Sequence, residues 1–155
     1  MAGKLELEIR QTKAIRLLEE EASLNIVRTA DVLMAKLVDV LKPYGLSATQ
    51  YNVLRILRGA GASGACCKDV ANRMLTRDPD ITRLMDRLEK RGLLTRDRAK
   101  EDRRFVTTRL TGAGLDVVNE LDGPVERLHR KQMKHMAADQ LRCLVGLLEE
   151  VRSGG

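Results

Sequence analysis

The stretch from residue 78 to residue 111 constrains the fold most, because it joins a helix with two chemically different faces to a charged hairpin. Its apolar side chains recur at helical spacing and predict one buried stripe. These side chains are Ile81, Leu84, Met85 and Leu88. The side chains between them are polar and mostly charged: Thr82, Arg83, Asp86, Arg87 and Lys90. A helix divided in this way buries one side and presents the other to solvent or to a partner.

The ends of this helix and the hairpin after it are also marked in the sequence. Asp78 is expected to cap the helix, with Pro79 in its first turn, and Gly92 is well placed to end it. Residues 93–96 and 105–110 have the composition of strands and are joined by a charged turn. A polar-faced helix followed by a basic-tipped hairpin predicts a winged helix-turn-helix.

Positive charge is concentrated in the same part of the chain. The net charge of the 155 residues is +6, and residues 62–111 alone carry 13 basic and 8 acidic side chains. Such a basic segment is typical of a surface that binds a polyanion. A solvated basic surface would explain the charge equally well, so the charge supports the interpretation without deciding it.

The segments on either side are predicted to be helical. Residues 4–42 contain neither Pro nor Gly and indicate one long helix or two abutting ones, ended by Pro43. Residues 113–136 and 137–151 form two further helical runs, and the first is expected to be kinked or divided at residues 123–124, Gly-Pro. Helices of this length in a small chain are expected to pack against a second copy.

The remaining elements complete the predicted helix-turn-helix. Ser47 and Gln50 have capping-box spacing and start a second helix. Residues 59–64 (GAGASG) indicate a flexible connection, and residues 66–75 indicate a short helix that precedes the two-faced one.

The predicted fold is therefore mainly α with a small antiparallel β-hairpin wing, in a single domain of 155 residues. Residues 46–111 form the winged helix-turn-helix, with the helix-turn-helix at 66–91 and the wing at 93–111. Residues 1–42 and 112–155 form dimerisation helices. This layout predicts a homodimer that presents two DNA-reading helices to a palindrome of double-stranded DNA.

Several classes of protein are excluded by what the sequence lacks. It has no Ser/His/acid set, no glycine-rich phosphate loop and no metal-ligand cluster, so we expect no enzyme activity, no cofactor and no metal site. Three cysteines do not make a disulfide framework, and the charged N-terminus is not a signal peptide. No apolar run approaches the roughly 18 residues of a membrane span. We therefore expect a cytoplasmic protein without membrane contact.

The run ITRLMDRLEKRGLLTRDRAKEDRRFVTTRLTGAG, residues 81–114, resembles the signature of MarR-type winged-helix transcriptional regulators. A Thr-Arg-Leu-x-Asp-Arg-Leu-Glu helix, Gly-Leu, Asp-Arg-Arg and Leu-Thr-x-x-Gly follow one another at the family's spacing. Residues 46–57 (LSATQYNVLRIL) resemble the family's second helix. The resemblance implies a dimeric DNA-binding repressor, or less often an activator, whose affinity is altered by a small molecule or by thiol oxidation.

The resemblance also implies roles for single residues. Arg83 matches a helix position that faces the major groove, and Arg103 matches the wing tip, which reaches the minor groove. Asp86 and Arg104 match an ion pair between helix and wing, and Arg104 joins the set of DNA-contacting residues. An acid near phosphate needs such a cationic partner. The alternative for Arg83 and Arg103 is that they are solvated charges.

Four other residues are candidates for DNA contact, each with a plainer alternative. Lys68 and Arg73 are placed to touch backbone phosphates, but they also fit a solvated face. Arg87 contacts phosphate or pairs with Asp86, and Thr82 donates to DNA or supports the first turn of its helix.

Two carboxylates at the start of the two-faced helix depart from the family pattern. Asp78 and Asp80 stabilise a helix start through its dipole but repel phosphate. Either they point away from DNA, or Asp80 accepts a hydrogen bond from a cytosine amino group. Capping is the interpretation that we prefer, and it leaves the base preference open.

The resemblance further implies an effector site between the dimerisation helices and the winged part. The residues expected to line it are Met34, Leu37, Tyr44, Tyr51 and Leu128. Cys66 and Cys67 stand beside Lys68 at the start of a DNA-proximal helix, which makes a thiol redox sensor a second hypothesis and simple packing its alternative. A third is an architectural winged helix that binds DNA without regulating transcription.

Overall fold

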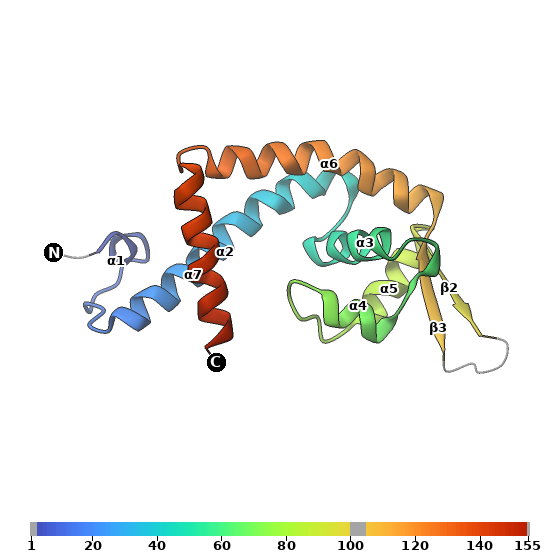
Figure 1. Cartoon of the computed structure of the whole chain (residues 1–155), viewed down its shortest axis with the longest axis horizontal. Coiled ribbons are helices and arrows are strands. Elements are labelled where there is room, and N and C mark those ends of the chain that lie inside the picture. Colours follow the sequence, from blue (N-terminus) through green and yellow to red (C-terminus); the bar gives the residue numbers. More distant parts are fainter. Residues whose placement is uncertain (1–2, 100–104, 155) are drawn as a thin grey trace.

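The computed structural model describes residues 3–99 and 105–154 (Figure 1). Its elements run in the order α1 (Lys4–Glu8), α2 (Leu18–Leu41), the 3-10 helix η1 (Lys42–Tyr44), α3 (Ala48–Ala60), the 3-10 helix η2 (Gly61–Ser63), β1 (Ala65–Cys66), α4 (Cys67–Arg73), α5 (Ile81–Lys90), β2 (Leu94–Arg98), β3 (Val106–Leu110), α6 (Gly112–Met133) and α7 (Ala138–Ser153). The predicted fold class is confirmed, because the protein is mainly helical with a small antiparallel sheet and helices at both ends.

The sheet has a third strand in addition to the two of the predicted hairpin. The strand order is β1-β3-β2, with Leu94 opposite Leu110 and Ala65 opposite Thr108. Gly64, just before β1, has a φ of +67°, and a Cβ on it would lie 2.5 Å from the carbonyl oxygen of Thr108. Glycine is therefore needed for β1 to approach β3. The connection predicted at residues 59–64 contains the end of α3, η2 and this approach, and its flexibility stays a prediction.

One hydrophobic core joins the winged part to α2 and α6. The apolar side chains with almost no exposed surface come from six elements: Leu41, Val53, Leu54, Leu57, Val70, Met85, Leu88, Leu94, Val118 and Leu121. In α5 the predicted stripe is confirmed, with Leu84, Met85 and Leu88 buried and Ile81 half-buried. Each large apolar side chain contributes roughly 1.5–3 kcal/mol when fully buried, so this stripe fixes which face of α5 points outward.

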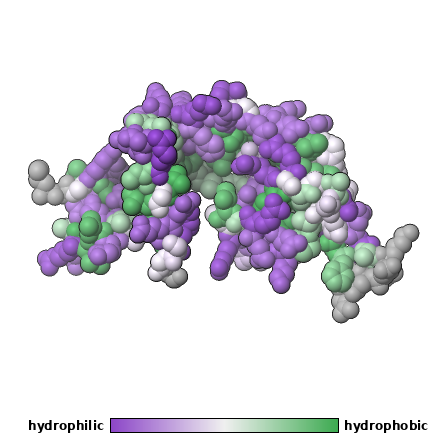
Figure 2. Space-filling view, viewed as in Figure 1, coloured by the Kyte–Doolittle hydropathy of each residue, from purple (hydrophilic) through white to green (hydrophobic). Residues whose placement is uncertain are grey.

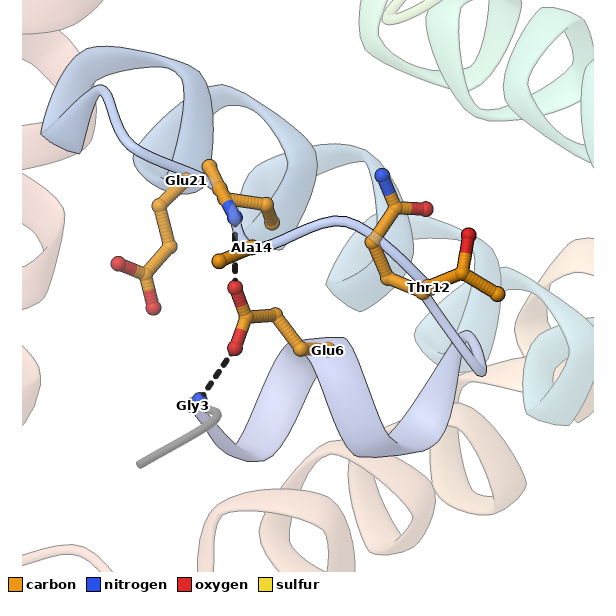
Figure 3. A pocket seen from close by; sticks show the side chains of 7 residues that line it. Gly3, Glu6, Thr12, Ala14 and Glu21 are labelled. Atoms are coloured by element: carbon orange, nitrogen blue, oxygen red, sulfur yellow. Dashed lines mark hydrogen bonds between the residues drawn. The ribbon is translucent and has the colours of Figure 1, made fainter.

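The N-terminal segment is neither the one long helix nor the two abutting helices that its sequence predicts. Residues 9–17 are not helical and separate α1 from α2. The carboxylate of Glu6 accepts hydrogen bonds from the N–H groups of Ile15 and Gly3, at 2.6 and 2.7 Å (Figure 3). These two bonds lower the pKa of Glu6, and Arg10 adopts a left-handed φ of +52° in the turn. The bond from Ile15 takes a backbone donor that a continuous helix would use, so the break needs neither Pro nor Gly.

α6 connects the winged part to the terminal helices (Figure 1). It runs unbroken through Pro124, so the helix is not divided at residues 123–124, and the alternative, a kink there, stays a prediction. Leu121 and Val125 are buried on either side of the proline and hold that turn on the core. Their burial offsets the loss of one helical hydrogen bond.

An ion pair joins α3 to α6. Arg58 donates from Nη1 and Nη2 to the two carboxylate oxygens of Asp122, at 2.7 and 2.9 Å, and from Nη1 to Asn119 at 3.0 Å. The hydrogen bond from Arg58 lowers the pKa of Asp122. Movement of α6 is thereby linked to α3, which packs against α4 and α5.

The terminal helices leave apolar surface uncovered. α7 has no buried residue, and Figure 2 shows hydrophobic residues on the terminal helices beside a hollow that separates them from the winged part. The most exposed apolar side chains here are Leu7, Leu17, Leu18, Val27, Val145, Leu147 and Val151. No helix in the described ranges 3–99 and 105–154 is long and apolar enough to cross a membrane.

Candidate nucleic-acid interface

The start of α5 differs from the prediction by two residues. Asp80, rather than Asp78, is the N-cap, and its side chain accepts from the N–H of Arg83 at 3.3 Å. Asp78 instead accepts from the N–H of Asp80 at 2.8 Å and shapes the turn before the helix. The predicted end is confirmed: Gly92 has a φ of +73°, and its N–H donates to the carbonyl of Glu89.

The outward face of α5 is polar and rich in cations. Thr82, Arg83, Arg87 and Lys90 are exposed, and the side chain of Arg83 retains 70% of its accessible surface. Lys68 and Arg73 of the neighbouring α4 are exposed as well. These exposed groups are accessible to an anionic partner.

The N-terminus of α3 lies beside the start of α5. Both line a shallow depression of about 380 Å³, together with Asp78, Asp80, Arg83 and Arg87. The α3 residues in it are Ser47, Thr49 and Gln50, of which Ser47 and Gln50 form the predicted capping box. The sequence predicts the capping box. Its position next to α5 depends on tertiary packing, which the spacing of residues in the sequence does not show.

Arg96 braces the wing against α5. From β2 it donates to the carboxylates of both Asp86 and Glu89, with 3.0 Å between Nε and Glu89. These hydrogen bonds, the one to Glu89 foremost, raise the pKa of Arg96. The predicted brace from Asp86 to Arg104 falls outside the described residues, as does Arg103. Arg96 was missed, although its alternation with buried Leu94 places it on the face of β2 that points toward α5.

We expect Arg96→Met to loosen the wing. The change leaves two carboxylates next to each other without this cation, and it should cost about 1–2 kcal/mol, or a fall of several degrees in Tm. Amide hydrogen exchange should speed up most in β2 and β3. Arg98→Met removes an exposed cation from the same strand and should change stability by less than about 0.5 kcal/mol. Equal effects of the two changes would argue against a brace at Arg96.

A second link runs from the end of α5 to the connection after α2. Arg91 donates to the carbonyl oxygens of Gly45 and Tyr44, at 2.7 and 2.8 Å. Gly45 has a left-handed φ of +62°. The C-terminal end of α5 is therefore attached to the connection between α2 and α3.

Comparison with known proteins identifies the family. Residues 46–106 match the MarR family profile. The crystal structure of a MarR transcription factor from Planctomyces limnophilus has 42% identical residues and a TM-score of 0.69, over 87% of this chain and 98% of that one. The chain belongs to the MarR family. It is thus a DNA-binding transcriptional regulator, and members of the family are not enzymes.

More distant regulators match most of this MarR-family chain. The transcriptional regulator FarR of Neisseria gonorrhoeae is 26% identical over 134 residues, which are 85% of this chain and 90% of FarR. The homoprotocatechuate degradative operon repressor of Escherichia coli is 24% identical over 133 residues, 86% of this chain and 88% of the repressor.

A cavity of about 100 Å³ lies between the terminal helices and the winged part of this MarR-family protein. Its lining comes from α2, α3, the segment after α4, and α6: Met34, Leu37, Ala48, Tyr51, Asn52, Arg55, Leu75, Thr76, Val125 and His129. Three of the five residues predicted for an effector site line it, namely Met34, Leu37 and Tyr51. Tyr44 packs against the core instead, and Leu128 does not line the cavity.

Polar groups of the cavity were missed in the sequence. The guanidinium of Arg55 lies 5.8 Å from the ring centre of Tyr51, and burial raises the pKa of the Tyr51 hydroxyl. The N–H of Leu75 donates to Asn52 at 2.8 Å. Among the lining residues that the structure describes there is no carboxylate. Tyr51 and Arg55 are four residues apart, so the sequence places them on one face of α3. Only the packing of α6 on α3 brings His129 near them.

The cysteines are placed differently from one another. Cys66 ends β1, and its Sγ accepts from the N–H of Asp69 at 3.5 Å as the cap of α4. Cys66 and Cys67 are half-buried, whereas Cys143 on α7 is exposed. The predicted helix at residues 66–75 is shorter and starts at Cys67. Within the described part of the chain no cluster of three or more potential metal ligands occurs. Redox sensing by Cys66 and Cys67 stays a prediction.

Proposed function

We propose that this protein is a homodimeric repressor that binds a palindromic operator in double-stranded DNA and is released from it by a small molecule. The observation that carries the proposal is the outward face of α5, where Thr82, Arg83 and Arg87 are exposed. The opposite face is buried in the core through Leu84, Met85 and Leu88. A helix held this firmly can enter the major groove with its polar face toward the bases. The E. coli relative is itself named a repressor.

The other cations are assigned by their position around that face. Lys68 and Arg73 on α4 contact backbone phosphates, and Arg103 and Arg104 extend the contact from the wing. The N-terminus of α3, with Thr49 beside α5, offers backbone N–H groups to a phosphate. Phosphate contacts set the register of the protein on DNA, while Arg83 and Thr82 supply the contacts that distinguish bases.

Residues 1–42 and 112–155 are assigned to dimerisation. The support is the uncovered apolar surface on these segments and an α7 without buried residues. A monomer rarely leaves such a surface in contact with water. A two-fold dimer formed there would place two copies of α5 about one helical turn of DNA apart.

The proposal is tested by selecting the sequences that the protein binds from random DNA. The mass of the protein–DNA complex in solution is then measured. Two chains on an inverted repeat are expected, with protection in two adjacent major grooves. An architectural DNA-binding protein would instead enrich no sequence and would bind all DNA with similar affinity. That outcome would overturn the proposal.

The cavity supports release by a small molecule. At about 100 Å³ it is smaller than the roughly 300 Å³ from which ligand sites usually start, so a ligand has to push its walls apart. Its walls belong to α2 and α6 on one side and α3 on the other, and α3 is tied to α6 by the Arg58–Asp122 pair. Widening the cavity would change the separation of the two recognition helices and weaken DNA binding.

The residues that line the cavity indicate which kind of small molecule it would bind. The described residues that line the cavity include Arg55 and His129 beside mainly apolar side chains, and no carboxylate is among them, which favours a small amphipathic anion. We expect millimolar benzoate, a simple probe of this kind, to weaken DNA binding by the wild-type protein. Arg55→Gln should shift the required benzoate concentration up by about tenfold. Arg127→Gln removes an exposed cation of α6 outside the cavity and should leave the response unchanged. Equal responses of the two variants would exclude Arg55 as the anion contact.

A further inference from the structure

We propose that Asp80 is a positioning residue that orients Arg83 for reading a guanine in the operator. The inference rests on the proposed function, in which Arg83 enters the major groove. It concerns which residue sets base specificity there. It also gives a role to one of the two carboxylates that the family pattern does not account for.

One carboxylate makes two contacts with the same arginine. Its Oδ1 accepts from the backbone N–H of Arg83 at 3.3 Å, and its Oδ2 lies 3.3 Å from Nε of the Arg83 side chain. The first contact caps α5, as any N-cap residue does. The second is not needed for capping. It holds the side chain over the first turn of the helix.

The ion pair with Asp80 leaves side-chain N–H donors of Arg83 available to DNA. The ion pair is closest at Nε, and the side chain of Arg83 remains 70% exposed, so its terminal Nη donors are accessible to a partner. Two parallel N–H donors match the O6 and N7 acceptors of guanine in the major groove. An arginine already held in one orientation loses less conformational freedom on binding than one that moves freely.

The arrangement also explains how an acid can stand at a DNA-facing helix start. The positive charge of Arg83 lies against the carboxylate and offsets its repulsion of phosphate. Asp78 has a different contact, since it accepts from the backbone N–H of Asp80 at 2.8 Å. The two acids are two residues apart and carry the same charge, so Asp78 provides a matched control.

The test compares Asp80→Asn with Asp78→Asn on the selected operator and on versions with single base-pair changes. Each variant removes one negative charge, and Asn keeps the capping and turn-forming oxygen. Arg83→Ala first identifies the base pair that Arg83 reads, as the position where discrimination is lost. The quantity measured is the ratio of Kd values for changed and unchanged DNA at that position. Asp80→Ser, which caps but is too short to reach Nε, serves as a second variant.

We expect discrimination of about 10- to 100-fold in the wild type and close to none in Arg83→Ala. Asp80→Asn and Asp80→Ser should lower the ratio by about fivefold or more, and Asp78→Asn should leave it within about twofold. Thermal stability should stay close to wild type in all three, because an exposed ion pair contributes little. Asp80→Asn combined with Arg83→Ala should behave as Arg83→Ala alone.

Three results would overturn the inference. They are an unchanged ratio in Asp80→Asn, an equal loss in Asp78→Asn, and a changed preference at a base pair that Arg83→Ala does not affect. The last would assign direct cytosine reading to Asp80. If Arg83→Ala altered the preference at no position, the proposed role of Arg83 itself would be wrong, and this outcome is distinct from the other three.

Discussion

Replacing Arg83 by glutamate should lower the affinity for the operator by at least about 100-fold. Each guanine contact of this kind is worth roughly 1–3 kcal/mol, and a dimer loses two of them while gaining two charges that repel phosphate. Fold stability should change little, since the side chain is 70% exposed and an acid in the first turn of α5 suits the helix dipole. Fluorescence anisotropy with labelled operator at fixed salt measures the effect.

The control for this prediction is Arg127→Glu, which makes the same charge change on the exposed surface of α6. It should weaken binding by less than about threefold, through the long-range field alone. A loss in Arg83→Glu that is the same for operator and unrelated DNA would assign Arg83 to phosphate contact only. Such uniform loss from weak initial binding would favour an architectural protein.

The fold could be predicted where one local rule acted without competition. The stripe of α5, the cap at Ser47 and the stop at Gly92 depend on neighbours within a few residues, and all three were predicted correctly. The break at residues 9–17 depends on Glu6 bonding to Ile15, nine residues away. No propensity or helix-breaking residue marks that contact, so the helical pattern extended too far.

The interface illustrates a second limit. Capping rules assign either Asp78 or Asp80 to the helix start, and the presence of Pro79 favoured Asp78. The structure assigns the cap to Asp80, because the turn closed by Asp78 lets Asp80 reach the N–H of Arg83. In the same way, the brace at Arg96 joins segments 7 and 10 residues apart, and only the packing of β2 on α5 selects that pair.

The second large effect that we expect comes from a charge placed on the apolar surface of α7. α7 carries an apolar stripe formed by Leu141, Leu144, Val145, Leu148 and Val151. Arg142, Asp139 and Glu150 lie on the other side of α7. None of the residues of α7 is buried within the chain. Proposed dimerisation would place the middle of the stripe, at Leu148, inside an apolar interface, where a charge without a partner is strongly disfavoured.

Leu148→Glu should therefore dissociate the dimer and lower the affinity for the full palindrome by about 100-fold or more, since the advantage of two linked contacts is lost. Affinity for an isolated half-site should remain as in the wild type, because the winged part does not depend on α7 for its core. Light scattering measures the dimer, and fluorescence anisotropy measures the affinity for both DNAs.

The control is Arg142→Gln, which also makes the net charge one unit more negative, but on the other side of α7. It should preserve the dimer. A Leu148→Glu protein that stayed dimeric would remove α7 from the interface, whereas equal losses on palindrome and half-site would show that the helix supports the winged part directly.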